Sequence, residues 1–385
     1  MNILEEIQNS SVEWKELGEV VDYEQPTKYI VSSKAYTDSN EIPVLTAGQS
    51  FILGYTNEKD GIYHASENNP VIIFDDFTTS KQWVDFKFKV KSSAMKMLTI
   101  KDEFENEVLL RYVWHYLGTI TYKPDQHGRQ WIGTYSKFLI PIPPLEIQEK
   151  IVQTLDKMTE YVTELTSELT SELTSRKKQY SYYRDKLLSF EDEVCQVEWK
   201  TLGEVAENLD NMRKPVAKGG RSLGIYPYYG ASGIVDYVDS FIFNGDYLLI
   251  SEDGANLVVR KTPIAFSISG KTWVNNHAHV LKFDNIINQK FVNYYLNYLD
   301  LSPYITGAAQ PKLNQQNLNN IKIPYPSLEI QSRIVQVLDN FDMVCNDLNI
   351  GLPKEIELRQ KQYEYFREKL LTFVAEGEYT ESRVE

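Results

Sequence analysis

The chain has 385 residues, of which 42% are apolar and 24% charged, a composition typical of a globular protein with two or three domains. No run reaches the roughly 18 apolar residues of a membrane helix, and the acidic start, MNILEEIQNSS, lacks the features of a secretory signal. We therefore expect a cytoplasmic protein. The only cysteines, Cys195 and Cys345, exclude a disulfide framework and a cysteine-based zinc site, and we expect both to be core residues.

The net charge of −14 argues at first against nucleic-acid binding, but the negative charge is unevenly distributed. Residues 21–141 carry −2 and residues 201–323 carry +1, so the other segments hold almost all of the excess. A near-neutral domain can still present a basic face, so both segments are compatible with DNA binding.

In chain order, residues 21–141 first combine strand and helix patterns. Short apolar runs at Pro70–Phe74 and Val84–Val90 predict strands, and the apolar spacing of Glu107–Leu117 predicts a helix. The proline-punctuated stretch Ile140–Pro144 is typical of extended chain that leads into a helix.

That helix, expected over residues 144–193, has apolar residues three or four positions apart. This spacing predicts a coiled-coil-like stripe, which needs a partner helix for its burial. Within the helix, residues 165–175 read LTSELTSELTS, a repeat of four residues. The stripe comprises Ile147, Ile151, Leu155, Met158, Val162, Leu165 and Leu169, followed by Tyr180, Tyr183, Leu187 and Phe190.

The second half of the chain repeats this order of patterns. A second long helix is expected over residues 327–376, where Gly351 and Pro353 should kink or break it, and an acidic tail over 377–385 follows. The preceding elements are predicted strands at Tyr247–Ile250 and Val280–Phe283, a helix at Gln289–Leu299 and an extended stretch at Ile321–Pro326.

The similarity of the halves is an internal duplication. Three collinear matches are separated by 185, 183 and 183 residues, while the segments between them differ strongly. Shared segments suggest a common partner, and divergent segments suggest two different ligands. The matches pair VEWKELGEV at 12–20 with VEWKTLGEV at 197–205, PIPPLEIQEKIVQTLD at 141–156 with PYPSLEIQSRIVQVLD at 324–339, and RKKQYSYYRDKLLSF at 176–190 with RQKQYEYFREKLLTF at 359–373.

The connectivity predicts how the two long helices run. A helix over residues 146–190 would be about 68 Å long, whereas a domain of about 120 residues has a radius of gyration near 14 Å. The second helix therefore starts near the end of the first and packs by running back. The expected fold class is mixed α+β, with two similar globular domains separated by an antiparallel pair of long coiled-coil helices. The resulting pseudo-two-fold symmetry would match that of duplex DNA.

The same residues carry a family resemblance that covers almost the whole chain. The Pro-Leu-Glu-Ile-Gln entry at 144–148, its Ser-containing copy at 327–331, the RKKQYSYYRDKLLSF segment and the stretch GAAQPKLNQQNL at 307–318 resemble the specificity subunits of type I restriction-modification systems. In that family, short repeats such as LTSELTSELTS set the gap within the DNA target. Four residues add about 6 Å of helix, of the order of one or two base-pair steps.

The resemblance implies a non-catalytic subunit that recognises an asymmetric, bipartite double-stranded DNA target. Its partners would be two methyltransferase subunits, which bind S-adenosylmethionine and flip an adenine, and motor-nuclease subunits, which use ATP and Mg²⁺. No cofactor or metal is expected on this chain. The implied domains are target-recognition domain 1 at 1–143, spacer helix 1 at 144–193, target-recognition domain 2 at 194–326 and spacer helix 2 at 327–376.

Candidate DNA-binding residues are polar or basic side chains in strand, turn and loop patterns. Lys87, Lys89 and Lys91 alternate with apolar residues, so a strand would place three cations on one face, toward phosphates. A lysine-protected edge strand is the alternative. Arginine and glutamine suit the edges of guanine and adenine, although ordinary polar loops explain most of these positions equally well. The other candidates are Thr78, Thr79, Ser80, Lys81, Lys96, Gly128, Arg129 and Gln130 in domain 1, and Arg213, Lys214, Lys218, Arg221, Gln310, Lys312 and Asn314 in domain 2.

Apolar helix residues are the candidates for contacts with partner subunits or with the other helix, two roles that the sequence does not separate. Two rival hypotheses remain: a stand-alone DNA-modifying enzyme, and a tandem protein-binding scaffold favoured by the acidic charge. The first lacks a P-loop and an Asn/Asp-Pro-Pro-aromatic methyltransferase loop. The interface candidates are Ile151, Leu155, Tyr183, Leu187, Ile334, Leu338, Tyr363 and Leu370.

Overall fold

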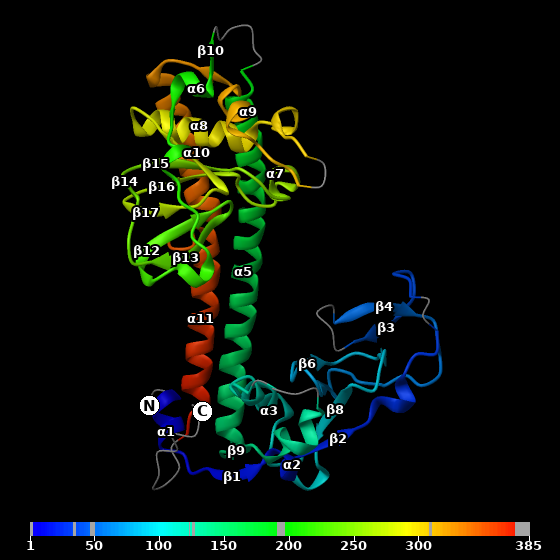
Figure 1. Cartoon of the computed structure of the whole chain (residues 1–385). Coiled ribbons are helices and arrows are strands. Elements are labelled where there is room, and N and C mark those ends of the chain that lie inside the picture. Colours follow the sequence, from blue (N-terminus) through cyan, green and yellow to red (C-terminus); the bar gives the residue numbers. More distant parts are fainter. Residues whose placement is uncertain are drawn as a thin grey trace. The chain divides into compact units, whose positions relative to one another are not determined.

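The computed structural model describes residues 3–33, 36–46, 51–122, 124, 128–190, 197–307 and 310–373 (Figure 1). The predicted acidic tail at 377–385 and Cys195 lie outside these residues. The chain forms two compact units, Met1–Ser167 with Glu357–Glu385, and Glu168–Ile356. We call the described residues 3–142 domain 1 and the described residues 197–325 domain 2.

Domain 1 is built mainly on a four-stranded antiparallel sheet with strand order β2-β8-β5-β6. A smaller sheet has the order β4-β3-β7, and β1 pairs with β9 where the chain enters and leaves the domain. The strands are β1 (Glu13–Glu16), β2 (Val21–Glu24), β3 (Ile42–Leu45), β4 (Ile52–Thr56), β5 (Val71–Asp75), β6 (Lys81–Val84), β7 (Lys89–Val90), β8 (Met95–Ile100) and β9 (Leu139–Ile142), and the α-helices are α1 (Ile3–Gln8), α2 (Leu17–Val20), α3 (Leu110–Leu117) and α4 (Gln130–Gly133).

Domain 2 repeats this plan with different side chains. Its main sheet has the order β11-β18-β15-β16, its second sheet β13-β12-β17-β14, and β10 pairs with β19. The strands are β10 (Glu198–Thr201), β11 (Glu207–Asn208), β12 (Leu223–Gly230), β13 (Gly233–Val238), β14 (Phe243–Asn244), β15 (Tyr247–Ser251), β16 (Ala265–Ile268), β17 (Lys271–Val274), β18 (Ala278–Lys282) and β19 (Lys322–Tyr325), and the α-helices are α6 (Leu202–Val205), α7 (Asn256–Val259), α8 (Ile286–Tyr298) and α9 (Gln315–Asn319).

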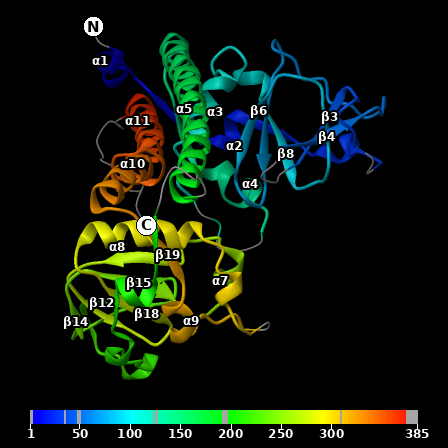
Figure 2. The same ribbon diagram turned by 90° about the horizontal axis from the view of Figure 1, so that it is seen from above.

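The main sheets of the two domains match strand by strand, which extends the duplication into segments whose sequences look unrelated, whereas β14 in the second sheet of domain 2 has no counterpart among the described strands of domain 1. In the main sheets, Asp75 opposite Met95 corresponds to Ser251 opposite Ala278. In each domain one helix, α3 or α8, packs against this sheet within a continuous apolar core (Figure 2). The buried strands β5 and β15 confirm the predictions at Pro70–Phe74 and Tyr247–Ile250.

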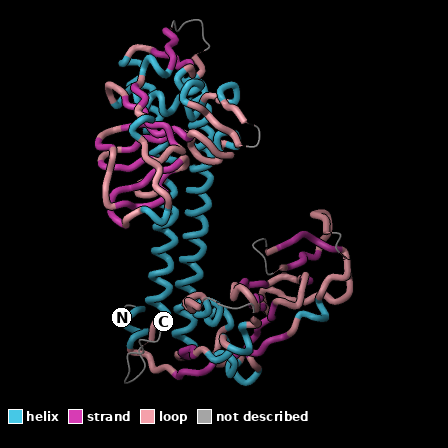
Figure 3. The backbone as a smooth tube through the Cα atoms, in the orientation of Figure 1, coloured by secondary structure: helices cyan, strands magenta, loops and turns pink. Residues whose placement is uncertain are grey.

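The long helices confirm the second part of the predicted fold class. Helix α5 (Leu145–Leu188) is unbroken over 44 residues, including the LTSELTSELTS repeat (Figure 3). The second helical segment is divided into α10 (Leu328–Asn346) and α11 (Leu352–Leu371). Gly351 lies at the break, as predicted, whereas Pro353 is in the first turn of α11, where a missing N–H costs little.

Each unit contains an antiparallel pair of these helices. In the first, Leu155 shares a core with Leu370 and Leu371, and Thr159 Oγ1 lies 2.9 Å from Tyr363 Oη. In the second, the ring of Phe341 lies against those of Tyr180 and Tyr183, at centroid distances of 6.0 and 5.7 Å. No described helix is long and apolar enough to cross a membrane.

An aspartate on the long helix joins each domain to its spacer. Asp156 Oδ1 of α5 accepts hydrogen bonds from Arg111 Nε and His115 Nε2 of α3, both at 2.8 Å. Burial lowers the pKa of His115 to about 4, despite the opposing influence of Asp156. The matching contacts in the second unit run from Lys290 Nζ and Tyr294 Oη of α8 to Asp339 of α10, at 2.6 and 2.7 Å.

One strand prediction was wrong. The expected strand Val84–Val90 is divided between the ends of β6 and β7, with exposed residues between them. Phe88, Lys89 and Val90 are all buried, so the expected alternation of a cationic face and an apolar face does not occur.

Candidate DNA-recognition sites

The turn after β5 presents three of the predicted polar residues in domain 1. Asp75 organises this turn, because its carboxylate accepts hydrogen bonds from Phe77 N at 2.9 Å and Thr78 Oγ1 at 2.5 Å. Thr79 has a positive φ of 60°, an unusual conformation for a β-branched residue. Thr78 and Ser80 are exposed, so a strained but well-bonded turn displays two hydroxyl groups.

A buried ion pair connects this turn to the loop that leaves the domain. Asp76 and Lys96 have fully buried side chains, with Asp76 Oδ2 3.0 Å from Lys96 Nζ. The other carboxylate oxygen of Asp76 accepts from Trp131 N at 2.9 Å, and its carbonyl accepts from Gln130 N, also at 2.9 Å. The turn at 75–80 and the loop at 128–131, two separate sequence predictions, are therefore held side by side.

Domain 2 has the same junction at the end of β15. Glu252 follows Ser251 as Asp76 follows Asp75, and its carbonyl accepts from Leu313 N at 2.8 Å. The carboxylate of Glu252 contacts Arg213 at 2.6 Å and Lys312 at 3.1 Å. The structure therefore brings together segments around 213, 252 and 312 that are far apart in the sequence.

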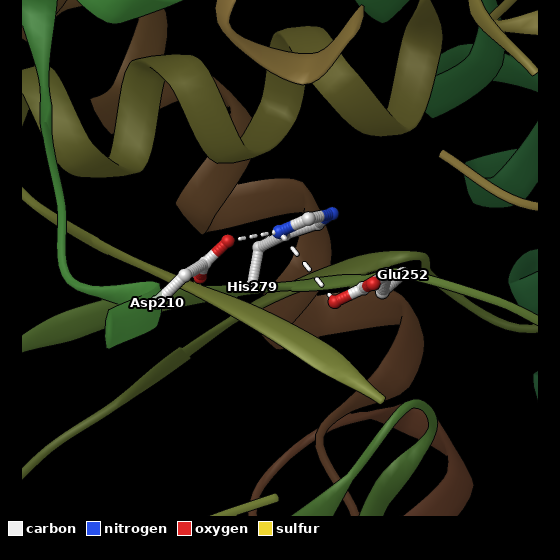
Figure 4. A group of neighbouring side chains, drawn as sticks. All are labelled: Asp210, Glu252 and His279. Atoms are coloured by element: carbon white, nitrogen blue, oxygen red, sulfur yellow. Dashed lines mark hydrogen bonds and ion pairs between the residues drawn. The ribbon is translucent and has the colours of Figure 1, made fainter. Parts of the chain in front are cut away.

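A histidine extends this second junction (Figure 4). His279 takes the place of Lys96 on the neighbouring strand, with its Nδ1 2.5 Å from Asp210 Oδ2 and 3.9 Å from Glu252 Oε2. Its Nε2 lies 2.7 Å from the carbonyl oxygen of Leu313. Figure 4 shows the imidazole ring between the two carboxylates. The exit loop of domain 2 is thus fixed through both its N–H and its C=O groups.

The carboxylates of this cluster are held ionised by neighbouring positive charges. Burial alone would raise the pKa of Asp210, but His279, the N–H of Val280 and Arg213 together lower it below its usual value. The pKa of Glu252 is likewise lowered, because Arg213 and Lys312 outweigh the effect of burial. Asp210, Glu252 and His279 have the spacing of a metal site, but Arg213 and Lys312 already balance the two carboxylates.

Several predicted DNA-binding residues have internal roles instead. Lys89 is buried, bonded to the carbonyls of Asp60 and Gly61 and 3.1 Å from Glu58. Lys96 forms an ion pair with Asp76. Neither cation is available to a phosphate in this conformation, because the Lys89 ammonium is already bonded within the protein and Lys96 would have to leave the buried Asp76 carboxylate unpaired.

The other inward-facing candidates stabilise loops. Gln130 is 6% exposed and donates to the carbonyl of Gly128 at 2.9 Å. Arg221 is bonded to Asp236 at 3.0 Å, and the Asn314 side chain caps α9. Arg213 belongs to the Glu252 cluster. These four residues shape the candidate sites rather than project from them.

Lys81 lies partly buried at the start of β6. Its Nζ and Nη1 of Arg367 both lie beside Gly118. A Cβ atom built on this glycine would lie 3.3 Å from the lysine nitrogen and 3.1 Å from the arginine nitrogen. Burial, reinforced by Arg367, lowers the pKa of Lys81 to about 7.

The remaining candidates are solvent-accessible. Lys91 is partly buried and donates to the hydroxyl of Tyr36 at 2.9 Å, whereas Gly128 lies half-buried at the start of the exit loop. Among the described residues of the loops bonded to Asp76 and Glu252, Arg129 in domain 1 and Lys312 in domain 2 are exposed cations. Lys87, Lys214 and Lys218 are exposed candidates outside these two loops. Gln310 is also exposed and lies two residues before Lys312.

Sequence reasoning missed the acidic residues that organise both junctions. Asp75 ends β5 and Asp76 follows it, directly after the apolar run Val71–Phe74, a position where paired carboxylates need a structural reason. Phe77, 41% exposed at the tip of the turn, was also missed. Asp210 and His279 had no detectable signal, because their contact depends on the pairing of β11 with β18.

The predicted interface residues divide into two groups. Tyr183 is 44% exposed, and Leu187 and Tyr363 are partly buried. The others lie in the cores that join each domain to its helices and cannot form a partner surface; they are Ile151, Leu155, Ile334, Leu338 and Leu370.

Comparisons with known proteins place these sites in a family. A model of the type I restriction modification DNA specificity domain matches residues 9–175 and again residues 196–358. The chain therefore belongs to this family of specificity subunits, which are not themselves catalytic. It is 43% identical to the type I restriction enzyme EcoR124I/EcoR124II specificity subunit of Escherichia coli over 97% of both chains. A putative specificity subunit of Haemophilus influenzae, S.HindORF215P, is 39% identical over 49% of each chain.

Solved structures support the fold. The type I restriction-modification S subunit from M. genitalium matches with a TM-score of 0.57 and 17% identity, over 95% of this chain and 98% of that one. A chain from a structure describing assembly and conformational transition of the type I R-M system gives 0.60 and 16% identity, with the same coverage. At these identities the likeness concerns the fold alone.

Proposed function

We propose that this chain recognises an asymmetric, bipartite DNA target, with one part read by each domain. The observation that carries the proposal is the duplicated junction, in which an acid at the end of a strand is bonded to the loop that leads out of the domain, and that loop bears an exposed cation. Divergent side chains on a shared frame suit two different half-sites. Thr78, Ser80 and Arg129 would contact DNA from domain 1, and Gln310 and Lys312 from domain 2, with a mixture of phosphate and base contacts.

The duplicated helices would dock two methyltransferase subunits. The matching aromatic pairs Tyr182–Tyr183 and Tyr365–Phe366 support this role, because all four side chains are 38–61% exposed. Exposed aromatic residues are enriched at protein interfaces. Motor-nuclease subunits would complete the complex. S-adenosylmethionine, ATP and Mg²⁺ would bind to these partners, which would methylate adenine or cleave DNA in the cytoplasm.

The test is to co-express the chain with the methyltransferase subunit encoded beside it and to map methylated adenines across the host genome by single-molecule sequencing. We expect a gapped, asymmetric motif with one methylated adenine on each strand. Replacement of domain 2 by that of a relative with another target should change one half of the motif only. A stable complex with active methyltransferase that methylates an ungapped motif would contradict the proposal.

A further inference from the structure

The first turns of α5 and α10 contain matching glutamines that differ in their hydrogen bonds. Gln148 and Gln331 occupy matching positions in α5 and α10, and both are almost fully buried, at 0% and 1% exposure. Each side-chain Nε2 donates to the carbonyl of the proline five residues earlier, Pro143 at 2.8 Å and Pro326 at 2.9 Å. This shared bond fixes each carboxamide in the same orientation relative to its helix.

In the first unit, the rest of the Gln148 carboxamide is paired with the protein's own main chain. Its Oε1 accepts from Leu109 N at 3.0 Å, and its Nε2 also donates to the carbonyl of Glu107 at 2.8 Å. Leu109 has an extended backbone directly before α3. A short main-chain segment thus supplies one donor and one acceptor to the exposed edge of the amide.

In the second unit, that segment is missing. Met95 and Arg111 of domain 1 correspond to Ala278 and Lys290 of domain 2. The interval between them is four residues longer in domain 1, so domain 2 has a shorter connection from this strand to its helix. Helix α8 starts directly at Ile286, so the main chain that could reach Gln331 is already helical.

The consequence is an unpaired carbonyl at Gln331. The N–H of Asn288, which takes the place of Leu109, donates to its own cap, Asn285 Oδ1, at 2.9 Å. Gln331 Oε1 is left buried without a hydrogen-bond partner among the described residues. A buried acceptor of this kind costs free energy unless something pairs with it.

A polar pocket opens where the domain 1 segment would lie. It has a volume of about 410 Å³ and is lined by Lys200, Asn288, Tyr325, Ser327, Leu328 and Gln331. Ser327 caps α10, a helix of 19 residues, and the first free N–H groups of that helix belong to the same region. The pocket therefore combines an orphan acceptor with several donors, as a peptide main chain requires.

We propose that this pocket binds a main-chain segment of a partner protein, which pairs with Gln331 as residues 107–109 pair with Gln148. The inference rests on the proposed function, in which the partner is a methyltransferase subunit. The segment presents an N–H to Gln331 Oε1 and a C=O to the remaining hydrogen of Nε2. The two halves of the duplicated chain are thus unequal docking sites, because the Gln148 carboxamide is fully paired within the chain, whereas Gln331, at 1% exposure, keeps an unpaired carbonyl in the wall of the pocket.

The first test compares Gln331→Met with its matched control, Gln148→Met. Gln148→Met removes three hydrogen bonds, so it should lower the melting temperature but leave the partner affinity of the folded protein unchanged. Gln331→Met removes one hydrogen bond together with an unpaired acceptor, so the melting temperature should change little. Its dissociation constant for the co-encoded methyltransferase subunit, measured by calorimetry, should rise on the order of tenfold.

A second variant fills the pocket without touching the glutamine. Leu328 is 52% exposed at its rim, so Leu328→Trp should leave folding intact and weaken the same complex on the order of tenfold. If both variants bind within about twofold of wild type, the pocket holds only water and the inference is overturned. If the wild-type chain itself forms no complex with that subunit, the proposed function fails as well.

Discussion

Domain 1 and domain 2 solve one structural problem with different chemistry. In domain 1, a single fully buried Asp76–Lys96 pair holds the exit loop. In domain 2, Glu252 occupies the corresponding position but shares its charge among Arg213, Lys312 and His279. Both domains have an acid directly after the matching strands β5 and β15, whereas the positively charged partners of that acid differ between the domains.

This difference shows how a recognition domain can diverge without losing its shape. The main-chain bonds of Asp76 to Gln130 and of Glu252 to Leu313 are equivalent, so part of what positions each loop does not depend on which cations pair with the acid. The exposed residues beside these bonds can therefore vary with the target. The predictions below test this division between frame and surface.

The largest effect is expected from Lys96→Met. The substitution removes the cation that pairs with the fully buried Asp76 carboxyl, which should destabilise domain 1 by about 3–5 kcal/mol. Thermal unfolding followed by calorimetry measures this loss. Lys87→Met, at an exposed position nearby, is the control and should change stability little. Equal effects of the two substitutions would show that the buried pair does not hold the domain.

Acid should weaken the Glu252 cluster of domain 2. The folded pKa values of Asp210 and Glu252 lie below their usual values, so their contribution to stability is complete above the usual carboxyl range and is lost as the pH falls from that range through the lowered folded values. Unfolding measured between about pH 5 and pH 2 should show this loss. Asp210→Asn should flatten the curve, and an unchanged curve would argue against the network.

A smaller effect on DNA affinity is expected from Arg129→Ala and Lys312→Ala. If each cation contacts a phosphate, each substitution should weaken binding similarly across sequences and reduce the slope of log K against log salt by about one. Titration of the assembled complex with duplex DNA at several salt concentrations measures both. Lys361→Ala on α11 provides a charge-matched control. A loss confined to one base pair would instead assign base recognition.

The smallest energetic effect is expected from deleting Leu169–Glu172. The deletion removes one repeat and shortens α5 by about 6 Å, while the half-buried leucines keep their order. The methylated motif should keep both halves, with a gap shorter by about one or two base pairs. Substitution of the same four residues without deletion should leave the gap unchanged, and a change in either half-site would contradict the spacer role.

The repeats and the long helices were predictable because each depends on local periodicity. The stripe from Ile151 to Leu169 determines one helix face, and Gly351 marks the interruption of the second segment. The start of α3 was placed three residues too early, because the bonds of Glu107 and Leu109 to Gln148 favour extended chain over another helical turn. Contacts across 39 and 41 positions leave no trace in the local pattern.

The candidate sites were only partly predictable. The segments at 78–80 and 128–130 were each singled out for their polar side chains, but their proximity depends on the tertiary contacts of Asp76 and had no signal in the sequence. The same limit explains why the burial of Lys89 and Lys96 was not predicted. A lysine in a strand reads as exposed until a buried carboxylate such as Asp76 is found beside it.

The unbroken passage of α5 through LTSELTSELTS also has a hereditary consequence. Each copy of the repeat is a whole number of codons, so slippage or recombination between copies preserves the reading frame. Because Leu165, Leu169 and Leu173 are equally half-buried, a gained or lost copy inserts or removes an interchangeable turn of helix. A single change in copy number therefore alters the length of α5 and introduces no new type of residue into the helix contacts.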